Sequence, residues 1–326
     1  MCTRVVYSGS NGMVATGRSM DWKTDMHSNL WVFPRGMKGN GETGENSLEW
    51  TSRYGSVVTS AFEIASTDGM NEKGLVANLL WLPETEYPVR DKNKPGLAIT
   101  AWVQYMLDNF ATVEEAVAYI DEDTFQVVSD MMPDGSRLAT LHLSISDATG
   151  DCAIFEYIGG KLTVYHSKEY KVMTNSPTYN KQLALSEYWK SIGGLSFLPG
   201  TNRAADRFAR ASFYINALPE TDDERIAVAS VFSVVRNASV PYGISTPESP
   251  EISTTQWRTV SESKNLRYFF ESSLTPNTFW VNLKDFDLSE GAPVFKLSIA
   301  NGEMYHGNTA KNFKTALPFK FMGVKG

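Results

Sequence analysis

The second residue of the chain carries two groups that could do chemistry together. Cys2 follows Met1 directly, and removal of Met1 would leave a terminal residue with a thiol and a free α-amine. An ionised thiol is a strong nucleophile, and an α-amine with a reference pKa of about 7.7–8.0 suits a general base near neutral pH. Nucleophile and base could therefore share one residue, without a histidine. Taken alone, the dipeptide fits an accidental Met-Cys start better.

An arginine and an aspartate, Arg18 and Asp21, stand close together at the end of a predicted strand. Arg18 would favour the thiolate of Cys2 if the fold brings the two together, because a nearby cation stabilises the charged form. Asp21 could accept a hydrogen bond from the α-amine and hold it in place. An Arg–Asp pair at the surface is common and contributes little to stability, so the spacing alone leaves both interpretations open.

The composition argues against several classes of partner. The chain has 326 residues, with 30 Lys and Arg against 37 Asp and Glu and a formal net charge of −7. This acidic balance argues against nucleic acid or an anionic membrane surface as the main partner. No apolar run reaches the roughly 18–20 residues that span a bilayer. We therefore expect a globular protein whose partner is a small molecule.

Cysteine and histidine usage predicts neither a metal site nor a cofactor. The chain has 2 cysteines and 4 histidines, the latter scattered singly, so it offers no disulfide framework and no zinc spacing. Cys152 stands at the start of a predicted strand, where a small buried hydrophobic residue is the expected role. No apolar leader precedes Cys2. We expect a cytoplasmic protein, or a periplasmic one if a leader has been removed.

Strand-type and helix-type patterns alternate in groups along the chain. The first group predicts strands at residues 4–7, 13–17, 30–33, 56–60 and 74–80, with a glycine-rich surface loop at 34–47. Two helices follow, one at 97–110 and one opened by Thr112 and Glu115 in a capping-box pattern. Further strands are predicted at 138–146, 152–157, 162–165 and 170–173. Helices at 181–192, 203–217 and 222–236 then precede a β-rich tail at 266–319, in which 279–283 is the clearest strand.

This order of elements predicts the fold class. Strand groups separated by helical groups indicate an α+β layered architecture and not a wound βαβ sheet. No repeat, low-complexity segment or linker divides the sequence, so we expect a single domain over residues 1–326.

Several separated motifs together resemble the choloylglycine hydrolases, the family of conjugated bile salt hydrolases and penicillin V acylases. The motifs are Met1-Cys-Thr3, Arg18-x-x-Asp21, Asp68-Gly-Met-Asn-Glu-Lys-Gly-Leu75, Thr174-Asn-Ser-Pro177 and Leu198-Pro-Gly…Asp206-Arg-Phe208. Jointly they are far more specific than any one alone. The resemblance implies a four-layer αββα sandwich of the N-terminal nucleophile hydrolase type, which agrees with the order of elements.

The resemblance also implies a role for each site residue. Cys2 would be the nucleophile with its amine as the base, while Arg18 and Asp21 tune and orient it. Asn175 would be an oxyanion-hole donor, with its side-chain amide aimed at the tetrahedral oxygen. Arg207 would complete the charged cluster around the thiol. From the residues alone, Asn175 is equally a turn residue and Arg207 could be a solvated charge on a helix.

One position departs from the bile salt hydrolases, which place an asparagine six residues after Leu75, where this chain has Trp81. The oxyanion would then be held by Asn175 and a backbone N–H, such as that of Trp81. Trp22 would face the same pocket, and the two indoles would form a flat apolar slot for an aryl or straight acyl chain. We expect Met20 to contact the substrate as well. The tryptophan pair resembles the penicillin V acylases of Gram-negative bacteria, which also cleave long-chain N-acyl homoserine lactones, although each indole could also be a core residue.

The sequence therefore predicts a cofactor-independent amide hydrolase that removes the acyl side chain of penicillin V, of N-acyl homoserine lactones, or of both. Bile salt hydrolysis is the alternative within the same class of enzyme. A non-catalytic binding protein on the same fold is the alternative from another class. The resemblance further implies a homotetramer.

Overall fold

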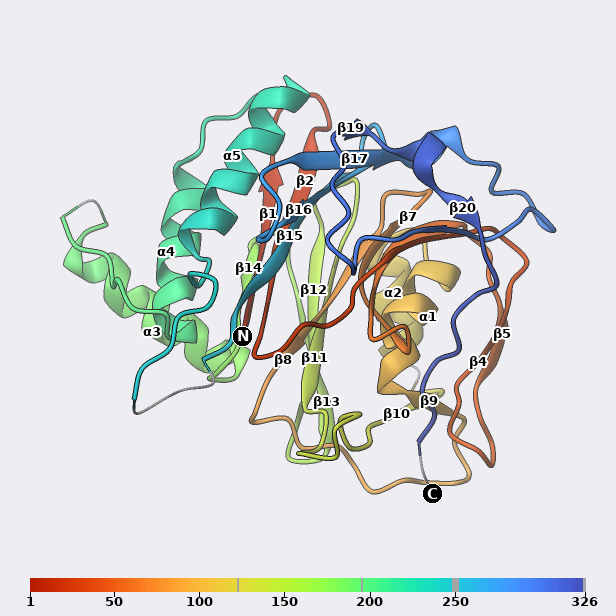
Figure 1. The fold of residues 1–326 in the computed structure, drawn as a ribbon. Helices are drawn as coiled ribbons and strands as arrows, with labels where there is room; N and C mark the ends of the chain where they lie inside the picture. The colour runs from red at the N-terminus through yellow and green to blue at the C-terminus, as the bar shows by residue number, and fades with distance from the viewer. Residues whose placement is uncertain (122, 195, 248–251, 325–326) are drawn as a thin grey trace.

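Two large β-sheets pack face to face between two layers of helices in the computed structural model (Figure 1). The structure describes residues 1–121, 123–194, 196–247 and 252–324. Helices α4 and α5 contact strands of the first sheet, and helices α1 and α2 contact strands of the second. The αββα sandwich expected from the resemblance, and with it the α+β class, is confirmed.

The first sheet joins strands from the two ends and the middle of the chain. Its order is β14-β1-β2-β15-β16-β17-β19, antiparallel except for the last pair. The bounds of these strands are β1 Cys2–Ser8, β2 Val14–Trp22, β14 Val172–Met173, β15 Thr254–Glu262, β16 Arg267–Ser272, β17 Thr278–Asn282 and β19 Gly307–Asn308.

The second sheet is antiparallel, with the order β13-β12-β11-β8-β7-β6-β3-β18-β20. Its strands are β3 Leu30–Phe33, β6 Ser56–Ala61, β7 Ala65–Asn71, β8 Val76–Trp81, β11 Leu141–Ser146, β12 Cys152–Ile158, β13 Lys161–His166, β18 Phe295–Leu297 and β20 Lys314–Thr315. Two short pairs lie outside the sheets, β4 Lys38–Asn40 with β5 Glu49–Thr51 and β9 Gly96–Ala98 with β10 Gln126–Val128.

The helices form the outer layers. The second sheet is covered by α1 Trp102–Asn109 and α2 Val113–Asp121. The later helices are α3 Tyr179–Ile192, α4 Ala204–Ala217 and α5 Glu224–Asn237, and short 3₁₀ turns are found at η1 Ile99–Ala101, η2 Leu283–Asp285 and η3 Ala310–Asn312. Thr112 Oγ1 accepts from the N–H of Glu115, as the capping-box pattern predicts. The Glu115 carboxylate reaches back to the N–H of Ala111 and not to that of Thr112.

The period-two alternation of β1 and β2 sorts the site residues onto two faces of the first sheet. Cys2 lies directly opposite Met20, and both line one pocket together with Arg18. Thr3 and Asp21, one residue further along each strand, point toward the helical layer. Arg18 and Asp21, the charged pair predicted from the spacing, therefore lie on opposite faces of the sheet, although both side chains lie near the start of β1.

Gly17 in β2 allows helix α5 to approach the sheet closely. A Cβ at this position would lie 2.5 Å from Val231 Cγ1 and 2.8 Å from Val235 Cγ2. Both distances are shorter than real side chains tolerate, so any larger residue would push the helix away from the strand that carries Arg18 and Asp21.

Most predicted elements are found, and the differences have local causes. Strands β7 and β15 were not predicted, because their polar residues hide the apolar pattern. The predicted helix at 97–110 begins at Trp102, since residues 96–98 form a strand with β10. The predicted loop at 34–47 contains the short strand β4. Cys152 is fully buried at the start of β12, as expected.

Candidate active site

The thiol of Cys2 lies at the first position of β1, buried and beside a cation. Its Sγ is 3.7 Å from Arg18 Nη2 and 3.9 Å from Met20 Sδ. Arg18 Nη2 donates a hydrogen bond to this sulfur. The structure therefore brings Arg18 to the sulfur, as the sequence predicts.

The guanidinium of Arg18 is fixed by contacts from both sheets. It donates to the carbonyl of Leu79 at 2.8 Å and to that of Thr67 at 3.3 Å, and it lies over the ring of Trp257 at 4.8 Å. Its ion-pair partner is Asp68, 3.7 Å away and also fully buried. The charge beside the sulfur is thus held in one position.

Asp68 is the buried counter-ion of this cluster and belongs to the quoted Asp68–Leu75 motif. Its carboxylate accepts hydrogen bonds from Tyr268, Asn78 and Thr259. Burial raises the pKa of Asp68, while Arg18 and these three donors oppose the shift. The cluster couples β7, β8, β15 and β16 to the cation beside the thiol.

The backbone nitrogen of Cys2 is held by Asn175, which lies directly after β14. Its N–H donates to Asn175 Oδ1 at 2.7 Å, and Asn175 Nδ2 donates to the carbonyl of Trp81 at 2.6 Å. The predictions that this amide donates to an oxyanion and that Asp21 accepts from the free amine of Cys2 apply to the chain without Met1 and stay predictions. In the structure with Met1 attached, Asn175 is the acceptor and one of its amide hydrogens is already engaged.

Arg207, in the first turn of α4, ties the helical layer to the start of β1. It donates to the carbonyl of Cys2 at 2.6 Å, to Thr3 Oγ1 at 2.7 Å and to Asn175 Oδ1 at 2.7 Å. The side chain is fully buried, and this burial lowers the pKa of Arg207 while Asp21 and Cys2 oppose the shift. It is a buried cation of the site and not a solvated helix charge.

Asp21 is the remaining carboxylate of the site, and it is also fully buried. Its Oδ1 accepts from Thr255 Oγ1 at 2.6 Å. Its Oδ2 lies 3.9 Å from Arg207 Nη1 and has no hydrogen-bond donor among the described residues. Thr255, on the unpredicted strand β15, is therefore a positioning residue that the sequence analysis missed. The available signal was the residue types at 254–260, where three threonines, a tryptophan and a valine favour a strand.

Met1 extends β1 by one residue toward Asp21. Its ammonium donates to the backbone carbonyl of Asp21 at 2.7 Å, and its own carbonyl accepts from the N–H of Asp21 at 2.9 Å. Burial lowers the pKa of this amine. While Met1 is attached, the nitrogen of Cys2 is an amide and cannot act as a base. Removal of Met1 would free the N–H and the carbonyl of Asp21 beside the new amine of Cys2.

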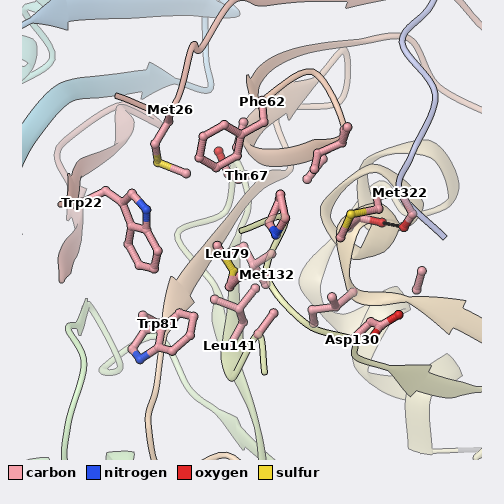
Figure 2. Close-up of a pocket in the computed structure, with 18 of the residues that line it drawn as sticks. Trp22, Met26, Phe62, Thr67, Leu79, Trp81, Asp130, Met132, Leu141 and Met322 are labelled. Atoms are coloured by element: carbon pink, nitrogen blue, oxygen red, sulfur yellow. Dashed lines mark hydrogen bonds between the residues drawn. The ribbon is translucent and has the colours of Figure 1, made fainter. Parts of the chain in front are cut away.

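An apolar pocket lies beside the thiol (Figure 2). Cys2, Arg18 and Met20 form part of its wall, together with Trp22 and Trp81. The two indole rings lie with centroids 5.4 Å apart and planes inclined by 53°. Both tryptophans therefore line the pocket, but their rings pack against each other at a tilt and do not form the two walls of a flat slot.

A buried histidine supports the loop that carries Asn175. His142 Nε2 lies 3.0 Å from the carbonyl of Thr174, and Nδ1 lies 2.9 Å from Glu156 Oε1. The other oxygen of Glu156 accepts from the N–H of Tyr179. His142 is a core residue with both ring nitrogens paired, which is the ordinary role expected for it.

Comparisons with known proteins give the family. Residues 2–296 match the family described as linear amide C–N hydrolases, choloylglycine hydrolase family. The chain belongs to this family. The chain is 50% identical to a penicillin V acylase of Pectobacterium atrosepticum, over 99% of this chain and 92% of that protein. It is 28% identical to a bile salt hydrolase/transferase of Clostridium perfringens, over 74% and 80% of the respective lengths.

Solved structures agree with this placement. The penicillin V acylase from Agrobacterium tumefaciens superposes with a TM-score of 0.93 at 56% identity, covering 99% of this chain and all of that one. A variant of the conjugated bile acid hydrolase from Clostridium perfringens gives a TM-score of 0.78 at 24% identity, which shows the shared fold. This choloylglycine hydrolase family member is therefore an amide hydrolase.

The described residues contain neither a cluster of metal ligands nor a membrane-spanning helix. No group of three or more His, Cys, Asp and Glu side chains in the described ranges could hold a metal ion. No helix in the described part of the chain is long and apolar enough to cross a bilayer.

Proposed function

We propose that this family member removes the acyl side chain of penicillin V and of N-acyl homoserine lactones, with Cys2 as nucleophile once Met1 has been removed. The observation that carries the proposal is the position of the Cys2 sulfur, in the wall of an apolar pocket and 3.7 Å from the buried Arg18 guanidinium. The two penicillin V acylases at 50% and 56% identity support the substrate class.

The reaction begins when the Cys2 thiolate attacks the carbonyl carbon of the side-chain amide and forms a C–S bond. The carbonyl oxygen becomes an oxyanion, which a backbone N–H and the Asn175 amide stabilise. The α-amine of Cys2, in its protonated form, gives a proton to the leaving nitrogen as the C–N bond breaks. A thioester and a free amine product result.

Hydrolysis of the thioester completes the cycle. The now neutral α-amine takes a proton from water, whose oxygen attacks the thioester carbonyl. The C–S bond breaks, the carboxylic acid leaves and the thiolate is restored beside Arg18. Asn175 has a second amide hydrogen besides the one donated to Trp81, and this hydrogen is the donor that the oxyanion requires.

The pocket favours aryl and straight acyl chains over a bulky steroid. Trp22 and Trp81 line the pocket beside the thiol with their rings packed against each other, and the rest of the wall is formed mainly by apolar side chains from both sheets. Phenoxyacetyl and fatty acyl groups present flat or flexible apolar surfaces that match such a slot. Bile salt hydrolysis remains the alternative activity, since a relative at 28% identity bears that name.

A substrate panel tests the proposal. Protein confirmed by intact mass to start at Cys2 is incubated with penicillin V, an acyl homoserine lactone and glycocholate, and the free amine is measured with fluorescamine. Turnover of penicillin V without comparable turnover of glycocholate is expected. Efficient cleavage of glycocholate alone would reverse the substrate assignment.

The nucleophile has its own test. Cys2→Ser and Cys2→Ala are expected to lose nearly all turnover while remaining folded, and an unchanged rate would end the assignment. Retention of Met1 in protein recovered from cells would block the proposed base and favour the non-catalytic binding protein. The homotetramer and the cellular location stay predictions, and light scattering on purified protein together with fractionation of cells checks them.

A further inference from the structure

We infer that the segment Met322–Val324 closes the far end of the acyl pocket and limits the length of the acyl chain. The inference rests on the proposed function, because it assigns the pocket to the acyl part of the substrate. All three residues of this segment line the pocket that contains Cys2. Part of the wall of this pocket is thus supplied by residues more than three hundred positions away from Cys2 in the sequence.

The tryptophan pair marks the nucleophile end of the pocket. Trp22 directly follows Asp21, and the carbonyl of Trp81 accepts from Asn175, which in turn holds the nitrogen of Cys2. In Figure 2 the two indoles lie on one side of the cavity and Met322 lies on the other. An acyl chain bound to the sulfur and running along the cavity therefore points toward Met322.

The side chains between these two ends are apolar or small. Figure 2 shows Thr67, Leu79, Met132 and Leu141 in the space between the indoles and Met322. An extended hydrocarbon chain gains free energy along such a wall in proportion to the area it buries. The gain stops where the chain meets the closing segment.

Main-chain bonds hold the closing segment in place. The N–H of Met322 donates to the carbonyl of Ile64, and the carbonyl of Met322 accepts from Thr100 Oγ1 at 2.8 Å. The N–H of Val324 donates to the carbonyl of Glu42 at 2.9 Å. None of these bonds uses the side chain of Met322, so a substitution there changes the length of the pocket without releasing the segment.

Methionine is well suited to this position. Its unbranched thioether side chain is flexible and fills irregular apolar space. Replacement by alanine removes the outer part of the side chain and lengthens the pocket, whereas replacement by tryptophan shortens it. The chain-length preference should therefore move in opposite directions in the two variants.

The experiment compares kcat/KM for hexanoyl, decanoyl and tetradecanoyl homoserine lactones in the wild type, Met322→Ala and Met322→Trp. One methylene more or less in an apolar pocket changes kcat/KM by about tenfold or more. The tetradecanoyl-to-hexanoyl ratio is expected to rise about tenfold in Met322→Ala and to fall by a similar factor in Met322→Trp. Met304→Ala is the matched control, since this methionine is exposed and lies outside the pocket lining.

Equal ratios in the wild type and both Met322 variants would overturn the inference. A wild type that cleaves none of the lactones would count against the proposed function instead. The pocket is then tested without catalysis, by titrating hexanoate, decanoate and tetradecanoate and following tryptophan fluorescence. A shift of the preferred fatty acid toward longer chains in Met322→Ala supports the inference, and an unchanged preference refutes it.

Discussion

Replacement of Asn175 by alanine and by aspartate separates two roles that this residue has in the site. Its Oδ1 accepts from the nitrogen of Cys2 and from Arg207, both at 2.7 Å, and its amide is the proposed oxyanion donor. Alanine removes the acceptor and the donor together. Aspartate keeps an acceptor facing Arg207, but it loses the oxyanion donor together with the hydrogen bond to the carbonyl of Trp81, toward which it turns a carboxylate oxygen.

The substitutions are expected to change both the free energy of unfolding and kcat, by different amounts. Alanine leaves two buried donors without an acceptor, and each costs about 1–3 kcal/mol. Because Arg207 keeps its bonds to Cys2 and Thr3, we expect a loss of about 2–4 kcal/mol in the free energy of unfolding. Loss of an oxyanion donor lowers kcat by about 10²–10³, and both variants should show it.

Stability is measured by urea unfolding followed by tryptophan fluorescence, and kcat by release of free amine from penicillin V. Asn301→Ala, at an exposed position, serves as the control for a lost asparagine. If Asn175→Asp keeps kcat within about threefold of the wild type, the side-chain amide is not an oxyanion donor. An unchanged urea midpoint in Asn175→Ala would refute the structural role of its hydrogen bonds.

Three further outcomes are expected. Burial raises the pKa of Asp108 to about 7, so the folded state binds a proton at this carboxyl more tightly than the unfolded chain does. The free energy of unfolding should therefore fall as the pH rises from about 4 to about 7, and Asp108 contributes a slope of up to about 1.4 kcal/mol per pH unit. Urea titrations across this range should show a shallower fall in Asp108→Asn, and an equal slope would contradict the assignment. Gly17→Ala forces its Cβ against Val231 and Val235 and should cost about 1–3 kcal/mol in urea unfolding; an unchanged midpoint would show that α5 shifts freely. Trp22→Ala should raise KM for penicillin V about three- to tenfold and change kcat less, whereas a fall in kcat alone would place the ring outside the acyl site.

Local patterns were sufficient to predict most elements around the site. The strand carrying Cys2 and the one carrying Arg18 have β-type runs that periodicity detects, and the Thr112 capping box marks the start of α2. Strand β15 escaped prediction because several of its buried residues, such as Thr255 and Thr259, are polar and hide the apolar alternation. Yet β15 pairs with β2 and carries Thr255, whose hydroxyl donates a hydrogen bond to the carboxylate of Asp21.

The partners of individual side chains could not be predicted. With Met1 attached, the nitrogen of Cys2 donates to Asn175 and Asp21 accepts from Thr255, so the expected bond between a free cysteine amine and Asp21 stays a prediction. Arg18 and Asp21 do not lie side by side, because the alternation of side chains along a strand turns them to opposite faces of β2. Asp68, in contrast, lay within a recognised motif, but its role as the buried partner of Arg18 became evident only from the 3.7 Å contact.

The sequence by itself determined which chemical groups are available: a thiol with an adjacent amine, a guanidinium close behind in the chain, two indoles and an alternating order of strands and helices. Only the tertiary structure decided how they meet, because hydrogen bonding and burial join segments whose separation leaves no trace in local periodicity. Cys2 and Asn175 lie 173 positions apart and touch at 2.7 Å. Met322 reaches the pocket of Cys2 in the same way, through the packing of the second sheet and its helices.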